Sequence, residues 1–190
     1  GLEPLSPRSP AARQFAYLSH SSCVALAGRP DTDEFEETTA AMTELGFTAG
    51  EASNVFGVTA AVLHLGNVAF VDREGGGGGG GDGDKSGSSI DPNADASVAH
   101  AARLLGCADE RLLRQAMVFR TVTAAGSVYK VPLNAEQAAD ARDALAKALY
   151  GRAFDWLVQR VNKAVAIAET SNATSVSEIG VLDIFGFEIF

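Results

Sequence analysis

The sequence has few basic residues, no initiating Met and no long apolar run. Lys and Arg number 15 against 24 Asp and Glu, which gives a formal net charge of −9. Because nucleic acids and anionic lipid surfaces are themselves negative, we expect neither as a partner. No apolar stretch has membrane length, and the N-terminal GLEPLSPRSPAAR lacks the apolar centre of a signal peptide. We therefore expect a segment of a cytoplasmic protein.

The chain is also poor in residues that build disulfide frameworks, metal sites and hydrolase triads. Its two cysteines, Cys23 and Cys107, can make at most one bridge, and we expect two reduced, partly buried thiols. The three histidines show neither zinc-ligand spacing nor an HExxH pattern, and no GxSxG elbow is present. These absences exclude the common zinc and serine hydrolase signatures.

The sequence does contain enough apolar residues to form the core of one folded unit. Its 190 residues are 46% apolar, within the usual range for one domain. We expect residues 1–13, rich in proline and serine, to be disordered. Seven glycines at 75–81 indicate a flexible surface insert at 73–95. A phosphate loop is disfavoured there because Asp84, not glycine, precedes Lys85.

Apolar spacing indicates that most of the chain is helical. Asn134 and Gln137 form a capping-box pattern for a long helix from residue 135 to about 169, on which Trp156 is expected in the core. We also expect helices at about 31–45, 51–65 and 98–105, which end at Gly46, Gly66 and Gly106, and a further helix capped by Asp109. The expected strands are one at 68–71 and a hairpin formed by 118–123 and 128–131.

An apolar run near the end of the sequence is followed by an acid and then a glycine. Residues 179–182 have the length and branching of a buried strand in a parallel sheet, whose ligands lie beyond the carboxyl ends of the strands. In phosphate-hydrolysing folds an acid at the place of Asp183 steers the Mg²⁺ shell, while a glycine N–H, as at Gly186, can approach the terminal phosphate. On Asp183 and Gly186 alone a simple turn is the better explanation, but Glu188, among three phenylalanines, raises the odds of the phosphate site.

The string IGVLDIFGFEIF at 179–190 resembles the switch II segment of the myosin motor domain. Three further blocks resemble upstream parts of that domain in the same order, namely YLSHSSC at 17–23, AAVLHLGNVAF at 60–70 and RDALAKALYGRAFDWLVQRVN at 142–162. The resemblance implies that residues 14–190 are a partial motor domain from the α/β P-loop motor fold. This part is expected to be mainly α-helical, with a short β-hairpin and a C-terminal strand.

The resemblance implies an actin-based motor that couples ATP hydrolysis to movement. Asp183 would then contact Mg²⁺ through water, Gly186 would donate its N–H to the γ-phosphate, and Glu188 would pair with a switch I arginine. The chain lacks that arginine's motif and a GxxxxGK(S/T) loop. We therefore expect the segment alone to bind neither ATP nor Mg²⁺ and to be inactive. Light chains or cargo would bind only other regions, and the implied location is the cytoskeleton.

Between Arg111 and Asn134 the chain has four basic residues and no acid. A solvated rim and a dock for an acidic partner are equally good explanations of this stretch. The myosin resemblance favours the dock, because the hairpin resembles a loop that touches actin, and it assigns actin binding to Arg120 and Lys130. Arg111 and Arg114 gain no such role.

Two other functions compete with a motor. The first is a non-catalytic fragment that binds actin or another partner without binding nucleotide. The second is a fragment of a small GTPase, since these share Asp-x-x-Gly. The second fails because no Asn-Lys-x-Asp motif is present and the helical blocks have no counterpart there.

Overall fold

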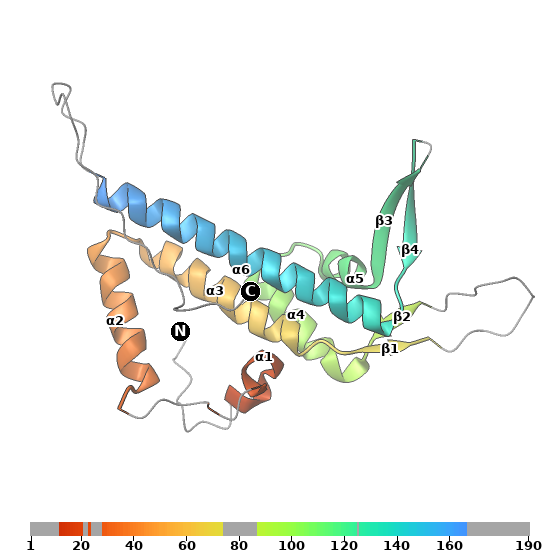
Figure 1. The fold of residues 1–190 in the computed structure, drawn as a ribbon, viewed down its shortest axis with the longest axis horizontal. Coiled ribbons are helices and arrows are strands. Elements are labelled where there is room, and N and C mark those ends of the chain that lie inside the picture. Colours follow the sequence, from red (N-terminus) through yellow and green to blue (C-terminus); the bar gives the residue numbers. More distant parts are fainter. Residues whose placement is uncertain (1–11, 21–22, 24–27, 74–86, 125, 167–190) are drawn as a thin grey trace, which may run out of the picture.

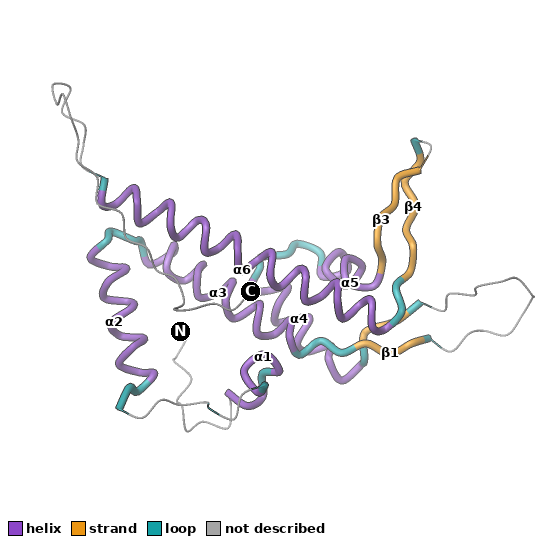
Figure 2. The backbone as a smooth tube through the Cα atoms, viewed as in Figure 1, coloured by secondary structure: helices purple, strands orange, loops and turns teal. Residues whose placement is uncertain are grey.

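The computed structural model describes residues 12–20, 23, 28–73, 87–124 and 126–166. This part of the chain is mainly helical, with two small antiparallel sheets (Figures 1 and 2), as the apolar spacing predicts. The predicted strand at 179–182 and the glycine run at 75–81 lie outside the described residues.

Two long helices lie at the centre of the fold. Helix α3 (Ala49–Gly66) packs along α6 (Ala135–Val165), and the two lie side by side in Figure 1. Each begins at a reciprocal capping box. At α6 the Asn134 side chain accepts a hydrogen bond of 2.8 Å from the Gln137 N–H, and the Gln137 side chain accepts one of 3.3 Å from the Asn134 N–H. These bonds satisfy N–H groups that would otherwise lack partners, so the predicted start of α6 is confirmed.

Helix α2 (Asp31–Glu44) is joined to α3 by a short corner. Gly46 has a φ of 72°, a left-handed conformation that glycine adopts without strain, so its predicted role at the end of α2 is confirmed. The corner is held to α6 by Arg160, which donates to the carbonyls of Leu45 and Gly46 and lies 4.7 Å from the ring centroid of Phe47.

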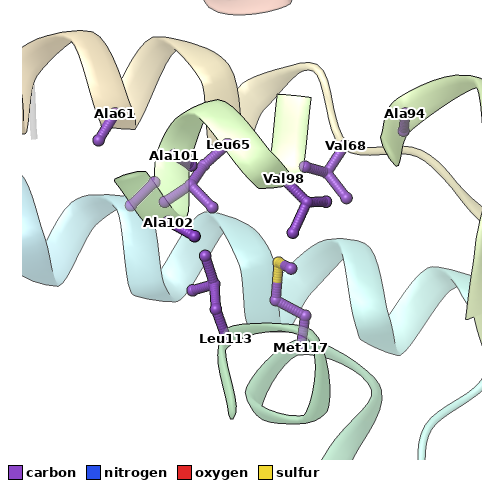
Figure 3. Packing of buried hydrophobic residues seen from close by; sticks show 10 residues of the cluster. Ala61, Leu65, Val68, Ala94, Val98, Ala101, Ala102, Leu113 and Met117 are labelled. Atoms are coloured by element: carbon purple, nitrogen blue, oxygen red, sulfur yellow. The ribbon is translucent and has the colours of Figure 1, made fainter. Parts of the chain in front are cut away.

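The core lies where α4 (Asp95–Leu104) and α5 (Glu110–Val118) close over α3 and α6. Its largest fully buried side chains are Leu65, Met117, Val68 and Val98, and burying each contributes about 1.5–3 kcal/mol. Small residues surround them, so that the helices approach closely. Figure 3 shows this cluster, which combines side chains from α3, α4 and α5 with Val68 just beyond α3.

Both sheets have two strands. Strand β1 (Phe70–Asp72) pairs with β2 (Ser88–Ile90), and β3 (Phe119–Ala124) pairs with β4 (Ser127–Pro132). The predicted hairpin is therefore confirmed. The sheet β1–β2 was predicted only as one brief strand, because its two halves are separated by the glycine insert.

The N-terminal part described consists of a 3-10 helix, η1 (Ala12–Gln14), and the short α1 (Ala16–Ser19). Asn67, just after α3, holds both: its side-chain oxygen accepts from the Ala16 N–H at 2.7 Å, and its amide nitrogen donates to the Gln14 carbonyl at 2.8 Å. Ala12 is buried. The predicted disordered segment 1–13 therefore extends too far, since residues 12 and 13 belong to η1.

Four further predictions need correction. Trp156 is 40% exposed rather than in the core. Both cysteines are exposed rather than partly buried. Gly66 lies inside α3, and Asn67 ends that helix. Residues 88–94 belong to the fold rather than to the insert predicted at 73–95, because β2 is followed by a 3-10 helix, η2 (Pro92–Ala94), in which Ala94 is buried.

Candidate functional site

The two residues predicted to bind a partner, Arg120 and Lys130, both lie on the β3–β4 hairpin. In the pairing register Arg120 is opposite Val131, and Lys130 is opposite Thr121. Since successive residues of a strand point to opposite faces, this register places Arg120 and Lys130 on opposite faces of the hairpin. A flat partner surface therefore cannot bind both side chains in the same way.

The face that carries Lys130 is turned toward α5. Its ammonium group donates a 2.8 Å hydrogen bond to the side-chain oxygen of Gln115 on that helix. The interaction is exposed, so it orients Lys130 without neutralising its charge. Gln115 therefore fixes the position of the Lys130 ammonium group, which stays exposed and can still contact a partner.

Arg120 shares its face with two exposed apolar residues. Val122 follows it by two positions on β3, and Tyr129 pairs with Val122 across the ladder. Val122 is 37% exposed and Tyr129 is 55% exposed. Within the described residues Arg120 forms no ion pair and no side-chain hydrogen bond. Its guanidinium is therefore available to a carboxylate, beside a small apolar patch. The alternation of residues along β3 is enough to place Val122 on the same face as Arg120 from the sequence alone. Tyr129 could be placed on that face only from the pairing register of the two strands.

The other two basic residues of the stretch are already paired. Arg111 binds Asp109 at 3.1 Å, and Arg114 binds both Glu110 and Asp95 at 2.6 Å. The hydrogen bonds from Arg111 hold the pKa of Asp109 below its usual value, so this carboxylate stays charged at neutral pH. The positive character of the region is therefore weaker than the sequence indicates, and it is concentrated on Arg120 and Lys130.

The base of the hairpin is tied to the rest of the fold by backbone bonds. The Leu133 N–H donates to the Val118 carbonyl at 2.9 Å, and the Ser88 N–H donates to the Leu133 carbonyl at 2.7 Å. Next to them, Asp72 of β1 accepts a 2.7 Å hydrogen bond from the Ala135 N–H at the start of α6. The hairpin thus projects from a junction of both sheets and α6, as Figure 1 shows. A rigid base of this kind holds Arg120 in a defined direction.

A second cluster of titratable side chains joins α1 to α6. Tyr17 donates a short hydrogen bond to the Asp143 carboxylate, which also binds Arg142 at 2.8 Å. Burial, followed by the hydrogen bond to Asp143, raises the pKa of Tyr17 to about 12. Arg142 also donates to the Val68 carbonyl at 2.7 Å. Because each group has a structural partner, this cluster connects helices rather than offering a reactive site.

Two histidines come together from α3 and α4. The ring centroids of His64 and His100 are 4.8 Å apart, and Phe15 packs edge-on against His64 at 5.3 Å. Burial, with the nearby charges of His100 and Arg103, lowers the pKa of His64. In the part of the chain that the structure describes, no group of three or more His, Cys, Asp or Glu side chains could hold a metal ion.

The residues predicted to contact nucleotide and Mg²⁺, Asp183, Gly186 and Glu188, lie outside the described residues. Their roles stay predictions from the sequence. Among the described helices, none combines the length and apolar character needed to cross a bilayer.

Comparison with known proteins identifies the class as a motor-domain protein. Residues 7–190 match the family model described as "Myosin head (motor domain)". The chain therefore belongs to the myosin motor-domain family, and the resemblance noted in the sequence is confirmed.

Individual relatives agree with the family match. The chain is 40% identical over 177 residues to "Myosin-1" of Mycosarcoma maydis, which covers 93% of this chain and 13% of the relative. It is 38% identical over 184 residues to "Myosin IB heavy chain" of Dictyostelium discoideum, covering 93% and 15%. It is 41% identical over 186 residues to "Myosin heavy chain IB" of Acanthamoeba castellanii, covering 95% and 14%. The chain thus spans only about one seventh of the length of these relatives.

Proposed function

We propose that this chain is part of an actin-based cytoskeletal motor that couples ATP hydrolysis to movement along actin filaments in the cytoplasm. The observation that carries the proposal is the family match across residues 7–190, which includes the segment that resembles switch II. The proposal concerns the intact protein, of which this chain is the part that contains switch II and some of the actin-binding region.

The C-terminal segment contributes to the proposed chemistry through three residues. Asp183 would hold a water of the Mg²⁺ shell, since a carboxylate suits this hard cation and its waters. Gly186 would donate its N–H to the γ-phosphate of ATP, because no Cβ blocks the approach. Glu188 would pair with an arginine of switch I and enclose the attacking water. Bound Mg²⁺ supplies charge neutralisation for phosphoryl transfer.

The hairpin contributes the actin contact in this proposal. Arg120 is the stronger candidate, because its charge has no partner in the described part of the chain and lies beside exposed Val122 and Tyr129. Lys130, held by Gln115 on the opposite face, would contact actin at the edge of the same interface. An exposed cation at an interface rim mainly affects encounter rate and salt dependence.

Charge reversal at Arg120 in the intact motor tests this assignment. Arg120→Glu is expected to weaken binding to actin filaments by about three- to tenfold at low salt, with a smaller difference at high salt. Cosedimentation across a salt series measures the effect. Arg111→Glu is the matched control, since Arg111 is exposed but lies off the hairpin and is paired with Asp109. If both substitutions weaken binding equally, the effect is one of net charge and Arg120 is not an actin contact.

A further inference from the structure

His64 of α3 and His100 of α4 lie against each other where these two helices pack. Their ring centroids are 4.8 Å apart, although the residues are 36 positions apart in the sequence. His64 is half-buried and His100 is exposed, so water reaches the pair. Within the described residues neither imidazole makes a side-chain hydrogen bond or an ion pair. Their nitrogen atoms are therefore available to a ligand.

The separation and the tilt of the two rings match those of imidazoles that share one metal ion. With metal–nitrogen bonds of about 2.0–2.1 Å and an angle of about 90–109° at the metal, two ligating rings have centroids about 4.5–5.3 Å apart. The observed separation of 4.8 Å lies inside this range. The interplanar angle of 56° fits as well, because the nitrogen lone pair lies in the ring plane. The planes of two tilted rings intersect, whereas the planes of two rings stacked in parallel share no point for an ion.

We propose that His64 and His100 form a binding site for a divalent transition-metal ion such as Zn²⁺, which bridges α3 and α4. Neutral imidazole is a good ligand for zinc, copper and nickel, whereas Mg²⁺ and Ca²⁺ prefer oxygen ligands. The described residues offer no third His, Cys, Asp or Glu ligand at this place, so waters complete the coordination. The site is separate from the Mg²⁺ of the proposed nucleotide chemistry and does not depend on it.

The packing of the fold holds both histidines in place before a metal binds. Leu65, which follows His64, and Ala101, which follows His100, are both fully buried in the core. Phe15 packs edge-on against the His64 ring, with centroids 5.3 Å apart, and restricts its movement. Only the exposed His100 ring has to adjust when an ion enters. Little conformational freedom is therefore lost on binding.

The charges around the pair set the expected affinity. Burial, with the nearby charges of His100 and Arg103, lowers the pKa of His64, so its imidazole is neutral at neutral pH. The positive charge of Arg103 also opposes a second cation nearby. We therefore expect weaker binding than at structural zinc sites, which have four protein ligands.

Calorimetric titration of the 190-residue chain with Zn²⁺ tests the proposal. We expect one ion per chain, and His64→Gln and His100→Gln should each weaken binding at least about tenfold, because either change leaves a single imidazole. His20→Gln is the matched control, since His20 is exposed at the end of α1. A variant with Cys23→Ala and Cys107→Ala controls for zinc binding by the exposed thiols. Both controls should bind Zn²⁺ as the parent does.

Urea unfolding shows whether the ion bridges the two helices. An ion that binds only the folded state raises the unfolding midpoint as its concentration increases. We expect this rise in the parent and in both controls, and its loss in His64→Gln and His100→Gln. Because His100 is exposed, His100→Gln keeps the test valid if His64→Gln does not fold. A large excess of Mg²⁺ should not displace the bound Zn²⁺.

Three results would overturn the proposal. The first is a parent chain that binds no Zn²⁺ or is not stabilised by it. The second is a loss of binding in His100→Gln but not in a folded His64→Gln, which would mean adventitious binding to one exposed imidazole only. The third is an equal loss in His20→Gln or in the variant without thiols, which would place the ion elsewhere.

Discussion

The ring of Tyr17 lies directly over Gly66. A Cβ placed at Gly66 would be 2.7 Å from Tyr17 Cδ2, closer than real Cβ contacts allow. The Tyr17 ring is itself fixed, because its hydroxyl donates to Asp143 on α6. Glycine is therefore required at this position for the contact between α1 and α3, and not to end α3.

Gly66→Ala should destabilise the protein by about 1–3 kcal/mol, since the added methyl forces Tyr17 out of its place. Urea unfolding followed by circular dichroism measures the change. Gly151→Ala is the matched control, because Gly151 also lies inside a helix but has nothing within 4 Å of an added Cβ. The control should be more stable than the parent by about 0.5–1 kcal/mol. A Gly66→Ala protein as stable as its parent would show that Tyr17 does not restrict this position.

The raised pKa of Tyr17 predicts a loss of stability at alkaline pH. Its pKa of about 12 in the folded protein exceeds the usual tyrosine pKa of 10.0, so the folded state favours the neutral phenol. The stabilisation is fully present below pH 10 and is lost as the pH rises toward about 12, because the unfolded chain ionises first.

Replacing the phenol should remove this alkaline component. Stability curves for Tyr17→Phe should lack the additional fall between about pH 10 and 12, whereas Tyr129→Phe, on the exposed hairpin, should keep it. Chemical unfolding at a series of pH values measures both. If Tyr17→Phe and the parent lose stability in parallel over this window, ionisation of Tyr17 is not the cause of the alkaline loss, and burial and the bond to Asp143 do not raise its pKa.

Arg160 is expected to hold the corner between α2 and α3 onto α6. Removing it in Arg160→Ala loses two hydrogen bonds to carbonyls, the ion pair with Glu51 at 3.3 Å and the contact with the Phe47 ring. We expect a loss of about 2–4 kcal/mol. Arg160→Lys should recover only part, because an ammonium group cannot reproduce the planar fork.

The single tryptophan makes this effect visible. Trp156 packs edge-on against Phe47 with ring centroids 6.0 Å apart, so its fluorescence should change when the corner moves away from α6. Lys163→Ala is the control, since Lys163 lies on the same helix and forms no ion pair or side-chain hydrogen bond in the described part of the chain. Equal effects of Arg160→Ala and Lys163→Ala would assign the change to helix charge.

The predictable parts of the fold depend on neighbouring residues in the sequence. The cap of α6 involves Asn134 and Gln137, and the cap of α5 involves Asp109 and Arg111, so each is visible within a few positions. The exposure of Trp156 could not be predicted in this way. The helical spacing of Trp156 with the apolar residues of α6 indicated burial. In the fold Trp156 is 40% exposed, and its ring packs against Phe47, a residue more than 100 positions away in the corner between α2 and α3.

The same distinction between local and distant contacts applies to the candidate site. The hairpin and its basic residues could be predicted from the strand-like runs, and the pair of Arg111 with Asp109 is local. The pair of Arg114 with Asp95 joins residues that are 19 positions apart, and the opposite orientations of Arg120 and Lys130 depend on the register. Sequence patterns therefore located the charged stretch but overestimated how much of its charge is available.

The last prediction concerns Gly186 in the intact motor and rests on its proposed contact with the γ-phosphate. Gly186→Ala should slow the hydrolysis step more than it weakens ATP binding. A methyl group at this position holds the backbone N–H away from the phosphate, and this loses an interaction that is needed when the switch closes. Initial capture of the nucleotide depends mainly on a phosphate-binding loop elsewhere in the motor, so it should change little. Transient kinetics measures the two steps separately. Hydrolysis at the parental rate, or loss of nucleotide capture itself, would remove Gly186 from the proposed switch.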